Sequence, residues 1–169
     1  MKARFKFLLG ALLPLSFTAS ATDKVTFTVT GKIISKTCSF QSPDVKFDLG
    51  QVEVGEHFTG VGSATEWVTE DLVSAGCGDD VSAVYMTFQA EADANDANLF
   101  KVNGGATGVA LELRSYDGVQ AKPDNSTRIR WSPRGNGSVY QYKARYKQTA
   151  SDVTTGAANA NITVNLAYE

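Results

Sequence analysis

Two cysteines, Cys38 and Cys77, are the residues of this 169-residue sequence with the clearest potential chemistry. Two cysteines are too few for a four-cysteine zinc site or for a scaffold held by several disulfides, so at most one bridge can form. In an oxidising compartment this pair is expected to form a disulfide. Closing a loop of about 40 residues would stabilise the fold by roughly 4 kcal/mol in the chain-entropy model. A reactive thiol is the alternative.

A catalytic triad would have to use His57, the only histidine. This residue lies in a polar, glycine-flanked segment, and no G-x-S-x-G nucleophile motif occurs in the chain. A solvated loop histidine is the favoured interpretation. The carboxylates are numerous, but the sequence cannot place two of them across a sugar as a glycosidase requires, and most are expected to be surface charge. We therefore predict that the protein is not an enzyme.

Ion and phosphate sites have equally weak signals. Residues 93–98, DANDAN, are rich in oxygen ligands but lack the glycine and the distant glutamate of a calcium loop, so they indicate a turn. The Gly60-Val61-Gly62 and Gly104-Gly105 stretches are not followed by the start of a helix, which a phosphate cradle needs. No metal and no cofactor is expected.

The N-terminus has the pattern of a secretory signal peptide. Lys2, Arg4 and Lys6 precede an apolar run of about 11 residues, and Ala19-Ser20-Ala21 fits a small-x-small cleavage site. The apolar run is too short to span a bilayer of roughly 30 Å. We assign residues 1–21 to the signal peptide, which makes a retained membrane anchor the weaker alternative.

The charge balance argues against nucleic acid as a partner. The chain has 16 Lys and Arg against 18 Asp and Glu, and cleavage after residue 21 removes three basic residues and no acidic one. The mature protein would then be acidic, whereas binding to a phosphate backbone requires a basic face. The scattered arginines and lysines between positions 128 and 147 are expected on solvated faces of strands.

The elements that must position all these residues are strands, because apolar residues recur with period two and no long amphipathic helix is found. Alternating runs occur at 25–33, 45–49, 84–88, 109–113, 140–146 and 162–168. Stretches rich in Gly, Asn and Asp separate them. Six or seven short strands at this spacing predict an all-β sandwich. The segment 55–69 has no clear register.

The first of these runs has two interpretations, because it directly follows the cleavage site. It is either an ordinary edge strand or an arm that completes the open sheet of a neighbouring molecule. Gly31 interrupts its apolar series, as either a bulge or a point where the arm crosses a crowded core. Periodicity alone favours the edge strand.

The mature sequence resembles the pilin subunits of chaperone-usher fimbriae, of the type 1 and P-pilus kind. The similarity covers nearly the whole mature chain. It rests on the signal peptide, the arm VTFTVTGKIISKTC, the segment VKFDLGQV, the second cysteine at position 77, the stretch GVALELRSYDG and the ending YKARYKQT followed by TGAANANITVNLAY. The ending is its most specific element, since Gly156 is the fourteenth residue from the C-terminus and Tyr168 is penultimate.

This resemblance implies an incomplete immunoglobulin-like β-sandwich that lacks its seventh strand. It implies an N-terminal donor-strand extension at 22–35 and a pilin domain at 36–169. The donor residues would be Val25, Phe27, Val29, Gly31 and Ile33. The strand that forms the groove edge and binds the chaperone would contain Gly156, Ile162, Val164, Leu166 and Tyr168.

The resemblance also implies a function. The protein would be a structural subunit of a bacterial fimbria that folds on a periplasmic chaperone, polymerises by donor-strand exchange at an outer-membrane usher and supports adhesion at the cell surface. Its partners would be other fimbrial subunits, the chaperone and the usher. A carbohydrate-binding tip adhesin is the alternative. The sequence does not distinguish a major pilin from an adaptor or a terminator, nor does it identify the receptor, chaperone or usher.

Two segments depart from the family pattern. Residues 70–76, EDLVSAG, replace the regular alternation that usually leads into the second cysteine, so the register of that strand is open. Tyr140 and Tyr142 are bulkier than the aliphatic residues often found there, which would change how the groove is filled.

Overall fold

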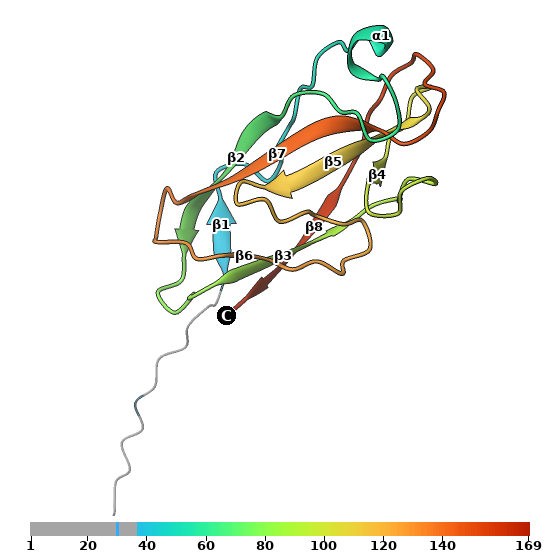
Figure 1. Cartoon of the computed structure of the whole chain (residues 1–169). Helices are drawn as coiled ribbons and strands as arrows, with labels where there is room; N and C mark the ends of the chain where they lie inside the picture. The colour runs from blue at the N-terminus through green and yellow to red at the C-terminus, as the bar shows by residue number, and fades with distance from the viewer. Residues whose placement is uncertain (1–29, 31–36) are drawn as a thin grey trace, which may run out of the picture. The chain divides into compact units, whose positions relative to one another are not determined.

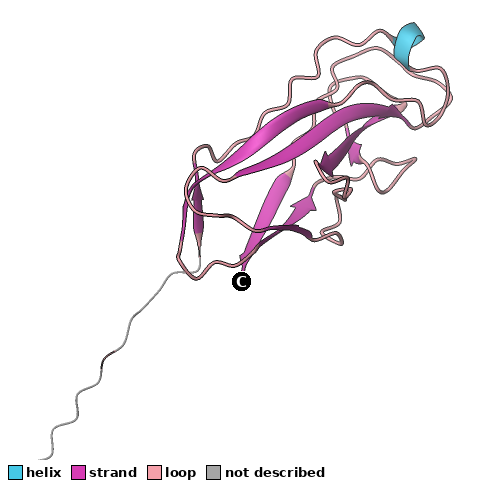
Figure 2. Ribbon diagram, turned by 60° about the vertical axis from the view of Figure 1, so that its left-hand side comes forward, coloured by secondary structure: helices cyan, strands magenta, loops and turns pink. Residues whose placement is uncertain are grey.

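Strands form nearly all the regular secondary structure of the computed structural model, which describes residue 30 and residues 37–169 (Figure 2). The predicted signal peptide at 1–21, and the predicted arm at 22–35 apart from residue 30, lie outside these residues. The elements are β1 Cys38–Phe40, α1 Val54–His57, β2 Val68–Cys77, β3 Val84–Gln89, β4 Phe100–Lys101, β5 Val109–Ser115, β6 Ile129–Trp131, β7 Val139–Gln148 and β8 Thr163–Tyr168.

The strands form two antiparallel sheets (Figure 1). One sheet has five strands in the order β1-β2-β7-β5-β4, and the other has three in the order β6-β3-β8. β1 and β4 are the edges of the larger sheet, while β6 and β8 are the edges of the smaller one. The prediction of an all-β sandwich is therefore confirmed. Within the described residues, no helix is long and apolar enough to cross a membrane.

The core lies between the two sheets, and the period-two pattern explains which residues enter it. Val84, Met86 and Phe88 point inward from β3, and Leu111 and Leu113 point inward from β5. All five are less than 9% exposed. Because successive side chains of a strand alternate between its faces, the intervening residues lie on the outside of each sheet.

The described residues contain eight strands, where the sequence predicted six or seven. The longest omission is β2, whose polar Glu70 and Asp71 conceal the alternation. Its backbone nevertheless pairs with β7 over six residues, from Val68 opposite Ala144 to Val73 opposite Val139. These pairs give the register of the strand that leads into Cys77, which the sequence left open. The unclear segment at 55–69 contains most of α1, a single helical turn, and the start of β2.

The run at 45–49 is not a strand, although its alternation predicted one. Val45, Phe47 and Leu49 are half-buried and the two residues between them are exposed, so the pattern correctly gives the side-chain directions. No neighbouring strand of the described residues hydrogen-bonds to this backbone. A ladder needs a partner strand, and none of the described strands provides one for this segment.

The expected disulfide joins Cys38 of β1 to Cys77 of β2, and it is present. The two residues are also directly opposite each other in the β1–β2 pairing. The bridge therefore fastens the short edge strand β1 to the larger sheet at the point where the chain enters the described domain.

Two loops cross at one end of the sandwich, and the second of them precedes β8 in the chain. Residues 103–107 and 154–159 form isolated bridges with each other, and a Cβ on Gly156 would overlap the backbone of Gly105 and Ala106. A Cβ on Gly104 would lie 2.6 Å from the Cβ of Ala157. Glycine is needed at both positions because two backbones approach closely there.

Candidate functional site: an apolar groove between two unpaired edges

A groove of about 760 Å³ opens between the two sheets. Its lining includes Phe88 of β3, Leu111 and Leu113 of β5, and Tyr142 of β7, all of which belong to the hydrophobic core. The groove therefore reaches the residues that a closed sandwich would cover completely. The apolar side chains along its two sides are only partly buried, which indicates a binding site for another chain.

One wall of the groove is β8. This strand pairs with β3 over six residues, from Thr163 opposite Gln89 to Tyr168 opposite Val84. It is the edge of its sheet, so its second edge has no strand partner among the described residues. Ile162, Val164 and Leu166 line the groove from this side. Val164 is 43% exposed, which is unusual for a valine in a strand that flanks the core.

The opposite wall is the segment 42–49. Val45, Phe47 and Leu49 line the groove, and the backbone of residues 45–49 makes no backbone hydrogen bond to any described residue. An unpaired strand edge is a template for pairing with another strand. The two walls therefore present two open backbone edges across an apolar floor, which is the geometry of a sandwich with one strand missing.

The groove continues toward the crossing of the two loops. A second hollow of about 430 Å³ shares Phe47, Leu49, Tyr146, Ala158 and Asn159 with the first. Gly156 lines this second hollow. The close backbone crossing at Gly156 thus fixes the end of the groove and the start of the wall that β8 forms.

Two tyrosines help to hold the floor and wall in place. The hydroxyl of Tyr142 donates a hydrogen bond to the sulfur of Met86 at 2.8 Å, and the hydroxyl of Tyr146 donates one to the carbonyl oxygen of Ala158 at 2.6 Å. Burial raises the pKa of both phenols, so both remain neutral and able to donate at physiological pH. The bulk of Tyr142 is accommodated as part of the floor.

The structure places the predicted site residues as follows. Ile162, Val164 and Leu166 line the larger hollow and Gly156 lines the smaller one. Tyr168 is half-buried opposite Val84, and its hydroxyl lies 3.5 Å from the carbonyl oxygen of Cys38. The predicted donor residues Val25, Phe27, Val29, Gly31 and Ile33 lie outside the described residues. Binding of a chaperone to the β8 wall remains a prediction.

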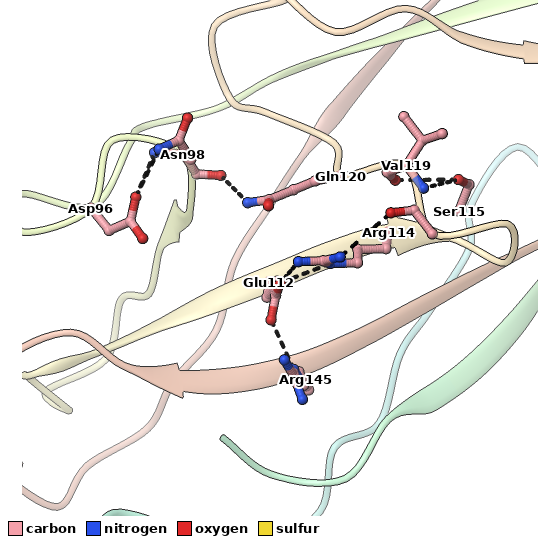
Figure 3. A network of polar contacts seen from close by, with 9 residues as sticks. Asp96, Asn98, Glu112, Arg114, Ser115, Val119, Gln120 and Arg145 are labelled. Atoms are coloured by element: carbon pink, nitrogen blue, oxygen red, sulfur yellow. Dashed lines mark hydrogen bonds and ion pairs between the residues drawn. The ribbon is translucent and has the colours of Figure 1, made fainter. Parts of the chain in front are cut away.

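Sequence reasoning missed a polar cluster on the other face of the larger sheet. Glu112 is 1% exposed and accepts hydrogen bonds from Arg114 and Arg145, each at 2.8 Å (Figure 3). Burial alone would raise the pKa of Glu112, but the hydrogen bonds and charges of both arginines outweigh it and lower the pKa. The sequence did contain one signal for this cluster. Glu112 and Arg114 alternate with Leu111 and Leu113, so both charged residues lie on the face of the sheet that points away from the core.

The weaker candidates have simple structural roles. Asp93 accepts backbone hydrogen bonds from Asn95 and Asp96 at 3.0 and 3.1 Å, which confirms the turn expected there. His57 lies in the single turn of α1, next to Glu56. Among residues 37–169, no three His, Cys, Asp or Glu side chains gather closely enough to hold a metal ion.

Comparison with known proteins adds independent information. The family model for fimbrial proteins matches residues 25–169. The S-fimbrial adhesin protein SfaS of Escherichia coli is 31% identical, over 94% of this chain and 93% of that protein. The type 1 fimbrial subunit of Salmonella typhimurium is 32% identical, over 82% of this chain and 80% of that protein.

A solved structure, that of the P pilus rod subunit PapA, superimposes with a TM-score of 0.67 at 22% identity. It covers 78% of this chain and 99% of that one. The fold is thus the incomplete immunoglobulin-like sandwich of the pilins, in agreement with the open groove. The sequence and structural comparisons agree, and the chain belongs to the fimbrial protein family.

Proposed function

We propose that this protein is a structural subunit of a bacterial fimbria that polymerises by donor-strand exchange. The observation that carries the proposal is the apolar groove between two unpaired backbone edges, β8 and the segment 45–49. A single inserted strand would pair with both edges and cover the floor of the groove. One event would thereby supply both hydrogen bonds and apolar burial.

The arm at 22–35 of another subunit has the chemistry of such a strand. Val25, Phe27, Val29 and Ile33 alternate with polar residues, so one face of an extended arm would be apolar. Burying each of these side chains is worth roughly 1.5–3 kcal/mol before the cost of ordering the arm. Gly31 would cross the groove at a point without room for a side chain.

Before polymerisation the groove requires temporary protection. The apolar side chains of its two walls, such as Phe47 and the 43% exposed Val164, remain accessible in an unpolymerised subunit, and exposed apolar surface beside unpaired edges promotes aggregation. A periplasmic chaperone that pairs with the free edge of β8 would provide this protection. The signal peptide at 1–21 would deliver the chain to the periplasm, and an outer-membrane usher would receive it there.

A carbohydrate-binding adhesin is the second candidate, and one specific observation favours it. A relative that this chain matches along 93% of its length is named an adhesin. Binding of the purified protein to a glycan array would support this candidate. Fimbriae that contain this chain as their repeating component and bind no glycan would support the structural role instead.

Groove filling tests the proposed function directly. The mature chain from residue 22, expressed without a chaperone, should aggregate or form detergent-resistant multimers. A variant that begins at residue 37 and carries a copy of residues 22–35 after Glu169, through a short flexible linker, should be a soluble monomer. The linker raises the effective concentration of the arm to about the millimolar range. A stable, unpolymerised monomer from the mature chain without any added arm would contradict the proposal.

Gly31→Leu provides the matched control. In the appended copy this substitution should lower the melting temperature, because a leucine would overpack the groove at a cost of roughly 1–3 kcal/mol. A second groove-filled monomer, which begins at residue 22 and so keeps a free N-terminal arm, should have an unchanged melting temperature when Gly31→Leu is placed in that free arm only. Equal losses in the two positions would indicate an ordinary edge strand.

A further inference from the structure

The inner side of β8 ends in a tyrosine that lies beyond the groove. Val164, Leu166 and Tyr168 alternate along one face of this strand, opposite the buried residues of β3. The first two line the larger hollow, and Tyr168 does not. On the other wall, Phe40 of β1 lines the hollow, and Cys38, two residues earlier, does not. The hollow therefore ends at the level where Tyr168 and Cys38 lie.

The side chain of Tyr168 closes this end of the groove. Its hydroxyl reaches toward the opposite wall and lies 3.5 Å from the carbonyl oxygen of Cys38. The side chain is half-buried and packs against the hydrophobic core. The aromatic ring thus spans the gap between β8 and β1. A strand that pairs with both walls cannot continue past the ring without displacing it.

The residue after Tyr168 fastens this end of β8. The amide of Glu169 donates to the carbonyl oxygen of Ala83 at 3.0 Å, and its own carbonyl oxygen accepts from the amide of Ala83 at 3.3 Å. The amide and the hydroxyl of Ser82 donate to the same carbonyl oxygen at 2.7 and 3.0 Å. The hydroxyl of Tyr85 donates to the Glu169 carboxylate at 2.8 Å. Strand ends otherwise fray easily, so these bonds hold the backbone that carries the ring of Tyr168.

The sequence of the predicted arm does not by itself define where the arm would lie along the groove. Its apolar series uses every second position from Val25 to Ile33. A slide of one residue would turn the apolar face away from the floor, but a slide of two residues would keep it there. Such a slide would bring Val29 or Ile33 to the point where Gly31 is expected to cross. A feature of the groove must therefore exclude the neighbouring registers.

We propose that Tyr168 is a stop that sets the register of the inserted arm. This inference rests on the proposed function, since it requires an arm in the groove. The ring excludes every position of the arm that extends further toward Cys38, and the bonds of Glu169 keep the ring in place. The close backbone crossing at Gly156 ends the groove on the opposite side. The arm is thereby left with the position in which Gly31 occupies the crowded point.

NMR spectroscopy of the groove-filled monomer that begins at residue 37 tests this inference. Nuclear Overhauser contacts between the appended arm and the segment 45–49 report the register directly. We expect one set of contacts in the unmodified protein and in Tyr168→Phe, which keeps the ring. Tyr168→Leu is too short to cross to β1, so it should add a second set, displaced by two residues toward Cys38. A single, unchanged set in Tyr168→Leu would overturn the inference.

Tyr168→Val is a second variant with the same expectation, because valine is short and favours strands. It replaces Tyr168→Leu if the leucine variant does not fold. Asn165→Ala is the matched control, because Asn165 is an exposed residue of β8 on the face away from the groove, and it should keep one register. If the appended arm of the unmodified monomer contacts neither wall, the proposed function fails as well.

Melting temperatures supply a second readout. Gly31→Leu in the appended arm should lower the melting temperature strongly when Tyr168 is present. In the Tyr168→Leu background the same substitution should cause a smaller fall, because the arm can shift until the leucine leaves the crowded point. A tyrosine with only a packing role would lower the melting temperature by itself and leave the fall caused by Gly31→Leu unchanged. That result would overturn the inference and leave the proposed function intact.

Discussion

The two faces of the five-stranded sheet are built from alternate residues of the same strands. They differ in how far their side chains find partners within one molecule. On the inner face, Leu111, Leu113 and Tyr142 line a groove that no described segment covers. On the outer face, Glu112 is enclosed by Arg114 and Arg145, and its carboxylate has hydrogen-bond partners. On the proposed function, the inner face is completed by an added strand, whereas the outer face is complete within one molecule.

This difference separates two kinds of contact. A missing strand exposes apolar surface and backbone groups together, so filling it changes the stability of the domain itself. A charged outer face loses little by remaining in water, so a contact there changes only the association between molecules. Substitutions on one face at a time therefore separate the two kinds of contact.

Removal of the disulfide should have the largest effect on the groove side. Replacing Cys38 and Cys77 by serine should cost about 4 kcal/mol, because the bridge closes a long loop in the unfolded chain. Urea denaturation of the groove-filled monomer measures this loss. Thiol labelling of the native protein provides the control, and it should detect no free thiol. Labelling of both cysteines would contradict the bridge.

Leu113→Ala should come next, because it removes a side chain from the groove floor. In the groove-filled monomer we expect a loss of about 2–5 kcal/mol, since truncation leaves a cavity beneath the inserted strand. The same substitution should shorten the lifetime of fibres in hot detergent. Thr69→Ala on the outer face is a control at an exposed position and should change neither quantity. Equal effects at the two positions would remove the distinction between the faces.

Gly156→Ala should destabilise the end of the groove. An alanine Cβ would overlap the backbone of Gly105 and Ala106, so the two loops must separate, at a cost of about 1–3 kcal/mol. Thermal unfolding of the groove-filled monomer measures this loss. Gly60→Ala is the matched control, because a Cβ there meets no atom within 4 Å. A melting temperature that falls by the same amount in both variants would disprove the role of the close crossing.

Glu112→Gln should have the smallest effect on stability, about 1–2 kcal/mol at neutral pH. This is less than the roughly 3–5 kcal/mol of a fully buried broken pair, because the two arginines are 34% and 26% exposed and can be solvated. Binding of the arm should be unaffected. A loss of arm binding in this variant would show that the two faces are coupled.

The same variant should alter the acid dependence of stability. The folded pKa of Glu112 is lowered, so its contribution is fully present above the pKa of the unfolded chain and is lost as pH falls through the folded pKa. Urea midpoints measured from pH 7 down to pH 2 should therefore fall more steeply in the unmodified protein than in the Glu112→Gln variant. Parallel profiles would contradict a lowered pKa.

Strands with a regular apolar alternation could be predicted from the sequence, as at 84–88, 109–113, 140–146 and 162–168. Some of their inward residues, among them Phe88, Leu113 and Leu166, line the groove, so part of the site followed from the same pattern. The disulfide followed from two lone cysteines in a chain whose N-terminus has the pattern of a signal peptide. These features depend on local periodicity and compartment, which a single sequence contains.

Features that depend on a neighbouring strand could not be predicted in the same way. Residues 45–49 have the pattern of a strand but lack a ladder partner, and β2 has a partner in β7 but lacks the pattern. The burial of Glu112 was also missed, because it requires Arg145 from β7 to lie beside it across the sheet. Pairing between distant segments decides each of these cases.

Amide hydrogen exchange along the two walls of the groove tests the central claim most directly. The chain from residue 37, kept at low micromolar concentration to limit the aggregation expected of an open groove, would be compared with and without a peptide of residues 22–35, and with a Gly31→Leu peptide as control. Bound arm should slow exchange at residues 45–49, which make no backbone hydrogen bond to any part of the chain that the structure describes, and at alternate amides of β8 that do not pair with β3. The account predicts this two-sided protection with the native peptide. Unchanged exchange in both walls would contradict it.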